Sequence, residues 1–181
     1  MNTLNLDRKE ITAKVQKELG IKNSQAVPQM TKIVLNIGLK EALKDEKIME
    51  EARGQLAQIV GQKPVITRAK AAIAGFKLRK GDAIGVMVTL RGKRMHDFLA
   101  KLVRVVLPRV RDFHGVPTTS FDGNGNYTLG MPEMSVFPEI DTGKTMRSFG
   151  FEMTINTTTR KDDEARKLLE ILGMPFRKVK S

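Results

Sequence analysis

The 181-residue sequence has no cysteine, no tryptophan and a single tyrosine. Without cysteine, disulfide bonds, thiolate metal sites and cysteine nucleophiles are excluded, and a reducing cytosol is permitted. No apolar run approaches the roughly 18 residues that a membrane-spanning helix needs. The beginning of the chain, MNTLNLDRKE, also lacks the apolar centre of a signal peptide, so export is not expected. A membrane-spanning segment and export are therefore not expected.

Acidic residues are few compared with basic ones. The chain has 20 Asp and Glu against 32 Lys and Arg, a formal net charge of +12. The imbalance is strongest from Lys63 to Arg94, where KPVITRAKAAIAGFKLRKGDAIGVMVTLRGKR holds nine basic residues and one acid, Asp82. This balance favours a polyanionic partner, nucleic acid first and an acidic membrane surface second. A soluble protein that is basic without such a partner is the alternative.

Hydrophobic periodicity predicts the order of the secondary structure. Apolar residues at helical spacing predict helices over 7–19, 44–60, 92–107 and 161–172. Alternating apolar and polar residues predict strands over 31–37, 64–70, 84–91 and 151–158. The stretch FDGNGNYTLG predicts a hairpin turn, with a return strand at 135–137.

The order of these elements predicts the fold class. From residue 31 onward it is β-α-β-β-α-β, which is typical of an α+β, ferredoxin-like split βαβ fold. Its antiparallel sheet carries helices on one face. An extra N-terminal helix, an inserted hairpin and a C-terminal helix complete it. The length of the chain suits one domain over 1–181, with a short, basic, mobile tail at about 174–181.

One face of the predicted sheet is left free of helices. Its side chains are polar or basic: Lys32, Asn36, Thr89, Arg91, Thr154 and Asn156. Because this face has no aromatic residue, base stacking of single-stranded RNA is not expected there. A polar sheet suits the phosphates, 2′-hydroxyls and shallow groove of a folded RNA. DNA remains open, although no helix-turn-helix, zinc or basic-zipper pattern is present.

A second basic feature lies between two predicted strands. Residues 71–83 predict a long exposed loop, with Gly75 and Gly81 as flexible points. Its middle gathers Phe76, Lys77, Arg79 and Lys80. One interpretation is a mobile basic loop without a particular role. The other is an arm that reaches a separate RNA element.

The sequence offers little support for an enzyme. His96 and His114 are its two histidines, and two isolated histidines do not make a metal site. The GNG of FDGNGNY lacks the strand-GxGxxG-helix context of a phosphate cradle, so a turn is favoured. We therefore predict no catalytic residue, no metal and no cofactor. A phosphate-handling ferredoxin-like enzyme is kept as an alternative to an RNA-binding protein.

A series of motifs, in this order, closely resembles the bacterial-type large-subunit ribosomal protein five family. They are GQKPVITRAK (61–70), AGFKLRKG (74–81), VTLRGKRM (88–95), LPRVRDFHG (107–115), FDGNGNY (121–127), FPEID (137–141) and LLEILGMPFRK (168–178). The resemblance covers nearly the whole chain. The sequence departs from the family pattern at Ala71, Ala72, His114, Asn124 and Met134, and the base of the loop is less basic than usual.

The resemblance implies a structural constituent of the central protuberance of the large ribosomal subunit, located in the cytoplasm and without a membrane partner. A nucleic-acid-binding module outside the ribosome is the alternative. A protein of the resembled family binds 5S rRNA with its free sheet face and also contacts large-subunit rRNA and neighbouring proteins of the protuberance. It further meets a small-subunit head protein across the subunit interface, and its basic loop reaches the transfer RNA in the peptidyl site. Carried over by position, the 5S rRNA contacts are Asn36, Gln62, Lys63, Thr67, Thr89 and Arg91. The tRNA-contacting loop contains Phe76, Lys77, Arg79 and Lys80.

Overall fold

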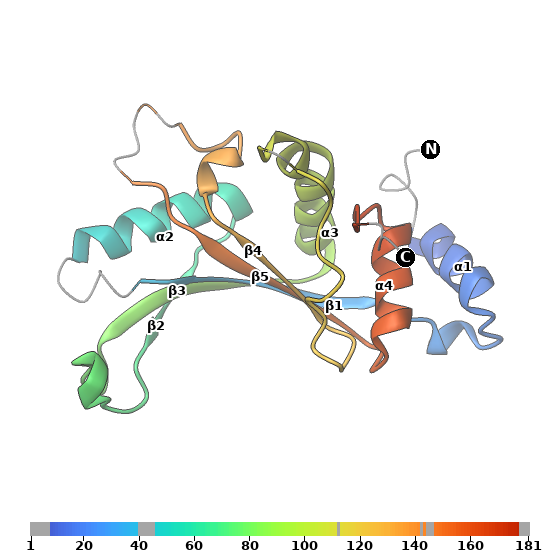
Figure 1. Ribbon diagram of the computed structural model, residues 1–181, viewed down its shortest axis with the longest axis horizontal. Helices are drawn as coiled ribbons and strands as arrows, with labels where there is room; N and C mark the ends of the chain where they lie inside the picture. Colours follow the sequence, from blue (N-terminus) through green and yellow to red (C-terminus); the bar gives the residue numbers. More distant parts are fainter. Residues whose placement is uncertain (1–7, 40–45, 112, 142, 144–146, 178–181) are drawn as a thin grey trace. The chain divides into compact units, whose positions relative to one another are not determined.

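The computed structural model describes residues 8–39, 46–111, 113–141, 143 and 147–177 (Figure 1). The helices of this part of the chain are α1 (Arg8–Leu19), α2 (Glu46–Val60), α3 (Gly92–Lys101) and α4 (Asp162–Ile171). The strands are β1 (Met30–Gly38), β2 (Val65–Arg68), β3 (Ala83–Leu90), β4 (Tyr127–Met131) and β5 (Phe151–Thr157). Single turns of helix occur at η2 (Ser24–Ala26), η4 (Ala74–Phe76), η6 (Leu107–Arg109) and η7 (Met134–Val136).

The strands form a five-stranded sheet in the order β2-β3-β1-β5-β4. The first four positions have the order expected of a split βαβ fold, because β3 lies between β2 and β1 although it follows both in the chain. β4 is added at one edge, next to β5. The predicted α+β, ferredoxin-like class is confirmed.

The chain divides into two compact units. The first contains Met1–Ile33, Arg91–Leu129 and Thr154–Ser181, and the second contains Val34–Leu90 and Gly130–Met153. Each unit therefore combines segments that are far apart in the sequence. We describe the two units separately.

In the second unit, α2 lies along one face of β2 and β3 (Figure 1). Its apolar stripe is buried, and so are the alternate residues of β1 and β3. These core residues are Leu35, Ile37, Ile48, Ala52, Leu56, Ile59, Val86, Val88 and Leu90. Burying such side chains contributes about 1.5–3 kcal/mol each for the larger ones. The helix thus fixes which face of these strands is left for a ligand.

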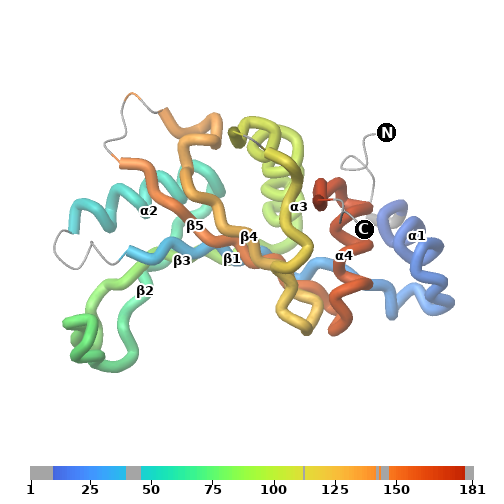
Figure 2. Tube along the Cα trace, viewed as in Figure 1, coloured from blue at the N-terminus to red at the C-terminus, as the bar shows by residue number. Residues whose placement is uncertain are grey.

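In the first unit, α1 and α4 lie side by side, as the tube view in Figure 2 also shows. Val15 of α1 and Leu168 and Leu169 of α4 are buried. The residues after α4 are held in place, because Val116 N donates to Pro175 O at 2.8 Å and Arg177 N donates to Val116 O at 2.9 Å. Of the predicted mobile tail at 174–181, residues 175–177 are thus hydrogen-bonded to the segment around Val116, and residues 178–181 lie outside the described residues. Its mobility stays a prediction.

The predicted helix over 92–107 is not regular along its length. The α-helix ends at Lys101 and continues as a π-helical segment, η5 (Leu102–Val106), and then as η6. Pro108 lies in η6 and has no main-chain N–H to donate, so it does not fit an α-helical continuation.

The predicted return strand at 135–137 is wrong. Residues Met134–Val136 form the helical turn η7, in which Phe137 N donates to Met134 O at 3.0 Å. The strand that follows the FDGNGNY turn is β4, and its partner in the sheet is β5. Met134 and Phe137 are buried, which favours a turn that places both in the core.

Candidate nucleic-acid interface

The residues expected to contact 5S rRNA belong to the second unit, with the exception of Arg91. Asn36 is in β1, Thr67 in β2 and Thr89 in β3. All three are half-buried, whereas the residues beside Asn36 and Thr89 in sequence are buried. The alternation therefore places Asn36 and Thr89 on the face opposite the buried stripe, as predicted. Thr67 lies on the same face as Thr89, because it pairs directly with Gly85 of β3. We call the exposed face of β1, β2 and β3 in this unit the platform.

The remaining two residues of this set in the second unit lie in the connection from α2 to β2. The side chain of Gln62 is tied to the platform, because its Nε2 donates to the main-chain oxygen of Thr89 at 3.2 Å. Lys63 is exposed beside it. The hydrogen bond fixes the start of this connection on the end of β3 and thereby positions both side chains.

Arg91 belongs to the first unit and occupies the N-cap position of α3. Its backbone is extended, with φ −138 and ψ 164, and its side chain makes no capping hydrogen bond. The guanidinium is exposed. The Arg91 side chain thus exposes its charge and does not cap α3.

Three further residues of the predicted free face belong to the first unit, and two of them use their side chains internally. Thr154 Oγ1 lies 3.2 Å from Thr128 Oγ1, and Asn156 Nδ2 donates to Asn126 Oδ1 at 3.1 Å. Lys32 is half-buried. Thr154 therefore contacts β4 and Asn156 contacts the turn before it, although both side chains were predicted to lie free on the sheet face.

Gly85 brings the platform strands close together. A Cβ atom at Gly85 would lie 2.4 Å from the main-chain oxygen of Ile37 and 3.0 Å from Thr67 Oγ1. The first distance is shorter than real Cβ contacts, and its partner is backbone. No other residue type fits this position without moving β1 or β3.

Two large apolar side chains are exposed on the platform strands β2 and β3. Val65 and Met87 are direct partners in the antiparallel pairing of β2 with β3. They are 65% and 36% exposed. Neither residue is among the polar free-face residues predicted from the sequence. The alternation of Val65, Ile66 and Thr67 was the signal that would have found Val65.

The pairing of β2 with β3 changes register at one point. Thr67 pairs with Gly85, but Arg68 pairs with Ala83, so Ile84 is an extra residue on β3. This β-bulge separates the platform from the loop that follows. The carbonyl of Ile84 accepts a hydrogen bond from Leu39 N at 2.9 Å.

Beyond the bulge, the predicted exposed loop is a folded arm. Ala69 N donates to Asp82 O at 2.8 Å, and Gly81 N donates to Ala69 O at 2.9 Å. Nearer the tip, Ile73 and Leu78 exchange hydrogen bonds of 3.1 and 3.2 Å. Figure 1 shows the turn η4 at the end of this arm. We call residues 69–82 the arm.

The tip of the arm has an unusual backbone. Lys77 has a φ of 55, the left-handed conformation, and among the described residues it is alone in this apart from glycines. Gly81 also has a positive φ, of 96, but Gly75 does not. Glycine adopts the conformation of Gly81 without strain, whereas Lys77 adopts its own at a cost. The flexibility expected at Gly75 and Gly81 stays a prediction.

The basic side chains of the arm point to solvent. Lys77, Arg79 and Lys80 are exposed, and Phe76 is 56% exposed. Asp82, the one acid of this stretch, accepts a hydrogen bond from the main-chain N–H of Arg79 at 2.7 Å. Its carboxylate is thus used to close the turn. The arm brings all four predicted tRNA-contacting residues into one short segment.

The FDGNGNY turn is closed from within. Asp162 accepts hydrogen bonds from Gly123 N at 3.0 Å and Gly125 N at 2.8 Å. Asp122 accepts from Asn126 Nδ2 at 2.7 Å, and this hydrogen bond lowers the pKa of Asp122. Since carboxylates of the chain already occupy these N–H groups, the turn does not cradle a phosphate.

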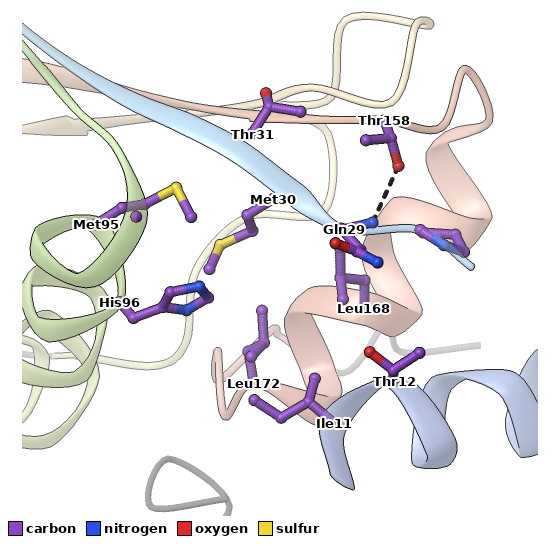
Figure 3. A pocket seen from close by; sticks show the side chains of 12 residues that line it. Ile11, Thr12, Gln29, Met30, Thr31, Met95, His96, Thr158, Leu168 and Leu172 are labelled. Carbon is purple, nitrogen blue, oxygen red and sulfur yellow. Dashed lines mark hydrogen bonds between the residues drawn. The ribbon is translucent and has the colours of Figure 1, made fainter. Parts of the chain in front are cut away.

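The first unit also contains a cavity of about 450 Å³, shown in Figure 3. Its walls are mostly apolar, with Ile11, Met30, Met95 and Leu172 around the opening seen in the figure. His96 points toward it from α3. Within the described ranges, no group of three His, Cys, Asp or Glu could hold a metal ion. The same ranges hold no helix with the length and apolarity of a membrane span.

Comparison with known proteins identifies the family. The family model of ribosomal protein L5 matches residues 23–79, and a second model, of the C-terminal part of the same ribosomal family, matches 83–176. The chain belongs to the ribosomal protein L5 family. Proteins of this family are structural proteins of the large ribosomal subunit in the cytoplasm and not enzymes, so the phosphate-enzyme alternative is set aside.

Several curated relatives from this family are similar along nearly the whole chain. The large ribosomal subunit protein uL5 of Desulfatibacillum aliphaticivorans is 52% identical over 179 residues, 98% of this chain and 100% of the relative. That of Acidobacterium capsulatum is 55% identical over 171 residues, 94% of each. That of Streptococcus sanguinis is 54% identical over 170 residues, again 94% of each.

Proposed function

We propose that this member of the ribosomal protein L5 family binds 5S rRNA through the platform and contacts the transfer RNA in the peptidyl site through the arm. The six expected 5S rRNA contacts are Asn36, Gln62, Lys63, Thr67, Thr89 and Arg91. Further partners are large-subunit rRNA, neighbouring proteins of the central protuberance and a small-subunit head protein across the subunit interface.

The observation that carries the first part is a helix-free sheet face that carries several polar side chains and no aromatic residue. Asn36, Thr67 and Thr89 offer amide and hydroxyl groups that suit 2′-hydroxyls and phosphates. No described carboxylate pairs with Lys63, so its charge is available to a phosphate. Folded RNA is the polyanion that such a face recognises by shape.

The arm supports the second part because its charges are separated from the platform by the bulge. Lys77, Arg79 and Lys80 project from a hydrogen-bonded hairpin, so their positions relative to one another are set by the protein before binding. Preformed contacts lose less conformational entropy on binding than a mobile loop does. This arrangement suits a second RNA that is itself folded.

The test of the first part is a salt series of binding between the purified full chain and 5S rRNA. Arg91→Ala is expected to weaken binding and to reduce the slope of log K against log salt by about 0.7 to 0.9, one phosphate contact. Arg160→Ala, a change at another exposed arginine of the first unit, is the matched control and should leave both unchanged. Wild-type protein that does not prefer 5S rRNA over other RNA would refute the proposal.

The test of the second part replaces Lys77, Arg79 and Lys80 by alanine together. This variant keeps Ile73 and Leu78, whose hydrogen bonds hold the hairpin. The 5S rRNA affinity is expected to stay near that of wild type, while ribosomes that carry the variant bind peptidyl-site tRNA more weakly. A collapse of 5S affinity with unchanged tRNA binding would mean that the arm is assigned to the wrong RNA.

A further inference from the structure

The described residues expose four large hydrophobic side chains, and all are in the second unit. They are Val65, Ile73, Phe76 and Met87, with 65%, 48%, 56% and 36% exposure. Scattered exposed apolar residues are normal in a soluble protein. Val65 and Met87 differ because they are directly paired across β2 and β3. They therefore form one continuous aliphatic surface in the middle of the platform.

The surroundings of this pair identify the kind of surface that covers it. Thr67 and Thr89 follow Val65 and Met87 two residues later on the same faces of their strands, so hydroxyl groups flank the pair. Lys63, two residues before Val65 in the connection from α2, is exposed. Arg68 follows Thr67 on the other face of β2, and its guanidinium donates to the main-chain oxygen of Gly81 in the arm at 3.0 Å. The one acid between Lys63 and Arg94 is Asp82, whose carboxylate is used within the arm. An aliphatic pair that is flanked by hydroxyl groups and by the charge of Lys63 is complementary to a polyanion that also has an apolar edge.

Double-helical RNA has such an edge in its minor groove. That groove is wide and shallow, and it presents ribose rings with their 2′-hydroxyls between two rows of phosphates. Ribose C–H edges suit contact with aliphatic side chains, whereas base faces suit aromatic ones, which the platform lacks. Val and Met side chains project only a short way from a sheet, so they fit a shallow groove without separating its base pairs.

We propose that Val65 and Met87 pack against the ribose edges of a double-helical RNA minor groove, with Thr67 and Thr89 beside them at the 2′-hydroxyls. This inference rests on the proposed function, since it assigns two further contacts to the platform. The contact is uncharged. It adds affinity by removing apolar area from water and releases no counterions.

The absence of counterion release makes the contact measurable apart from the charged ones. The test variant is Val65→Thr with Met87→Gln, which keeps side-chain shape and length but makes both positions polar. In a salt series with 5S rRNA we expect binding about five- to tenfold weaker, with the slope of log K against log salt unchanged. Lys63→Gln is the comparison, because it should lower the slope by about 0.7 to 0.9.

The control variant is Ile73→Thr, the same kind of change at an exposed residue of the arm. Its 5S rRNA binding should equal that of wild type. Thermal unfolding of all variants checks that the exposed substitutions leave the fold intact. Binding to two short duplexes of the same sequence, one of RNA and one of DNA, tests whether the minor groove of RNA is recognised. Wild type should bind the RNA duplex more tightly than the DNA duplex. The double variant should lose most of this difference in affinity.

The possible outcomes separate this inference from the proposed function. Wild-type protein that fails to bind 5S rRNA refutes the proposed function. Wild-type binding with an unaffected double variant, or with a variant whose salt slope falls, refutes the ribose contact alone. A double variant that binds 5S rRNA normally but no longer sediments with large subunits would show that a protein covers the pair, and this also overturns the inference.

Discussion

Gln62 and Thr89 are joined by a hydrogen bond of 3.2 Å between the side-chain Nε2 of the first and the main-chain oxygen of the second. The bond fixes the connection after α2 to the end of β3, although the two residues are far apart in the sequence. It couples two positions that are both expected to contact 5S rRNA.

Replacing Gln62 by alanine is expected to weaken 5S rRNA binding about three- to tenfold. The reason is the loss of one hydrogen bond, worth about 0.5–1.5 kcal/mol, that holds the connection in place. Filter binding or calorimetry measures the change. Gln58→Ala, at an exposed glutamine of α2, is the control and should bind like wild type. If the Gln62 variant binds 5S rRNA as tightly as wild type, Gln62 does not contribute to the binding site.

Gly85→Ala is expected to destabilise the protein by about 1–3 kcal/mol, because the new methyl group meets the Ile37 carbonyl. Denaturant unfolding measures the loss. Gly54→Ala is the matched control. Gly54 is a helical residue of α2 with open space around it, and there the same change should stabilise the protein by about 0.5–1 kcal/mol. Equal effects at the two glycines would contradict the close approach of β1 and β3.

Lys77 can be tested through its backbone as well as its charge. Both Lys77→Gly and Lys77→Ala remove the charge, but only glycine adopts the left-handed conformation without strain. We expect the Ile73 and Leu78 amides, which bond across the arm, to exchange their hydrogens several-fold more slowly in the glycine variant than in the alanine variant. If charge alone matters, the two variants will exchange alike.

Tyr127 gives a prediction for alkaline pH. Burial raises its pKa from the ordinary 10.0 to about 12, and its hydroxyl donates to Pro117 O at 2.8 Å. Because the folded protein keeps a proton that the unfolded chain releases, this stabilisation is complete below pH 10 and is lost as the pH rises toward about 12. The loss amounts to about 2–3 kcal/mol by linkage.

The chain has one tyrosine, so the ultraviolet absorbance of tyrosinate reports this residue directly. The folded protein should titrate well above the unfolded one. Tyr127→Phe is the control: its free energy of unfolding should lack the part of the pH dependence that wild type shows between about pH 10 and 12. A tyrosine pKa near the ordinary 10.0 in the folded wild type would show that water reaches the Tyr127 hydroxyl.

The sequence was sufficient for the parts of the fold that local periodicity determines. Val86, Val88 and Leu90 are buried as their alternation predicts, and Asn36 and Thr89 lie on the other face. Pairing between distant segments was not available from local patterns. The partner of β4 is β5, which begins at Phe151, so the return strand was wrongly sought next to the turn.

The candidate site was predictable to a smaller degree. Periodicity alone indicated Asn36, Thr89 and Arg91, while Gln62, Lys63 and Thr67 came from the family resemblance. Their roles stay predictions. Val65 was missed because an apolar residue in a strand is ordinarily assigned to the core, and burial depends on whether a helix covers that point of the sheet. The folded state of the arm was missed because a single left-handed residue, Lys77, leaves no composition signal.

The β-bulge at Ile84 also bears on how this molecule tolerates change. Side chains of a strand alternate between faces, so one inserted residue normally reverses every position beyond it. The bulge already absorbs one extra residue between the two segments. Changes of length or sequence within the arm therefore stop at this point and leave Val65, Thr67 and Thr89 facing the same way. The arm is in this sense an exchangeable module, which selection or design can alter while the sheet that carries it keeps its own register.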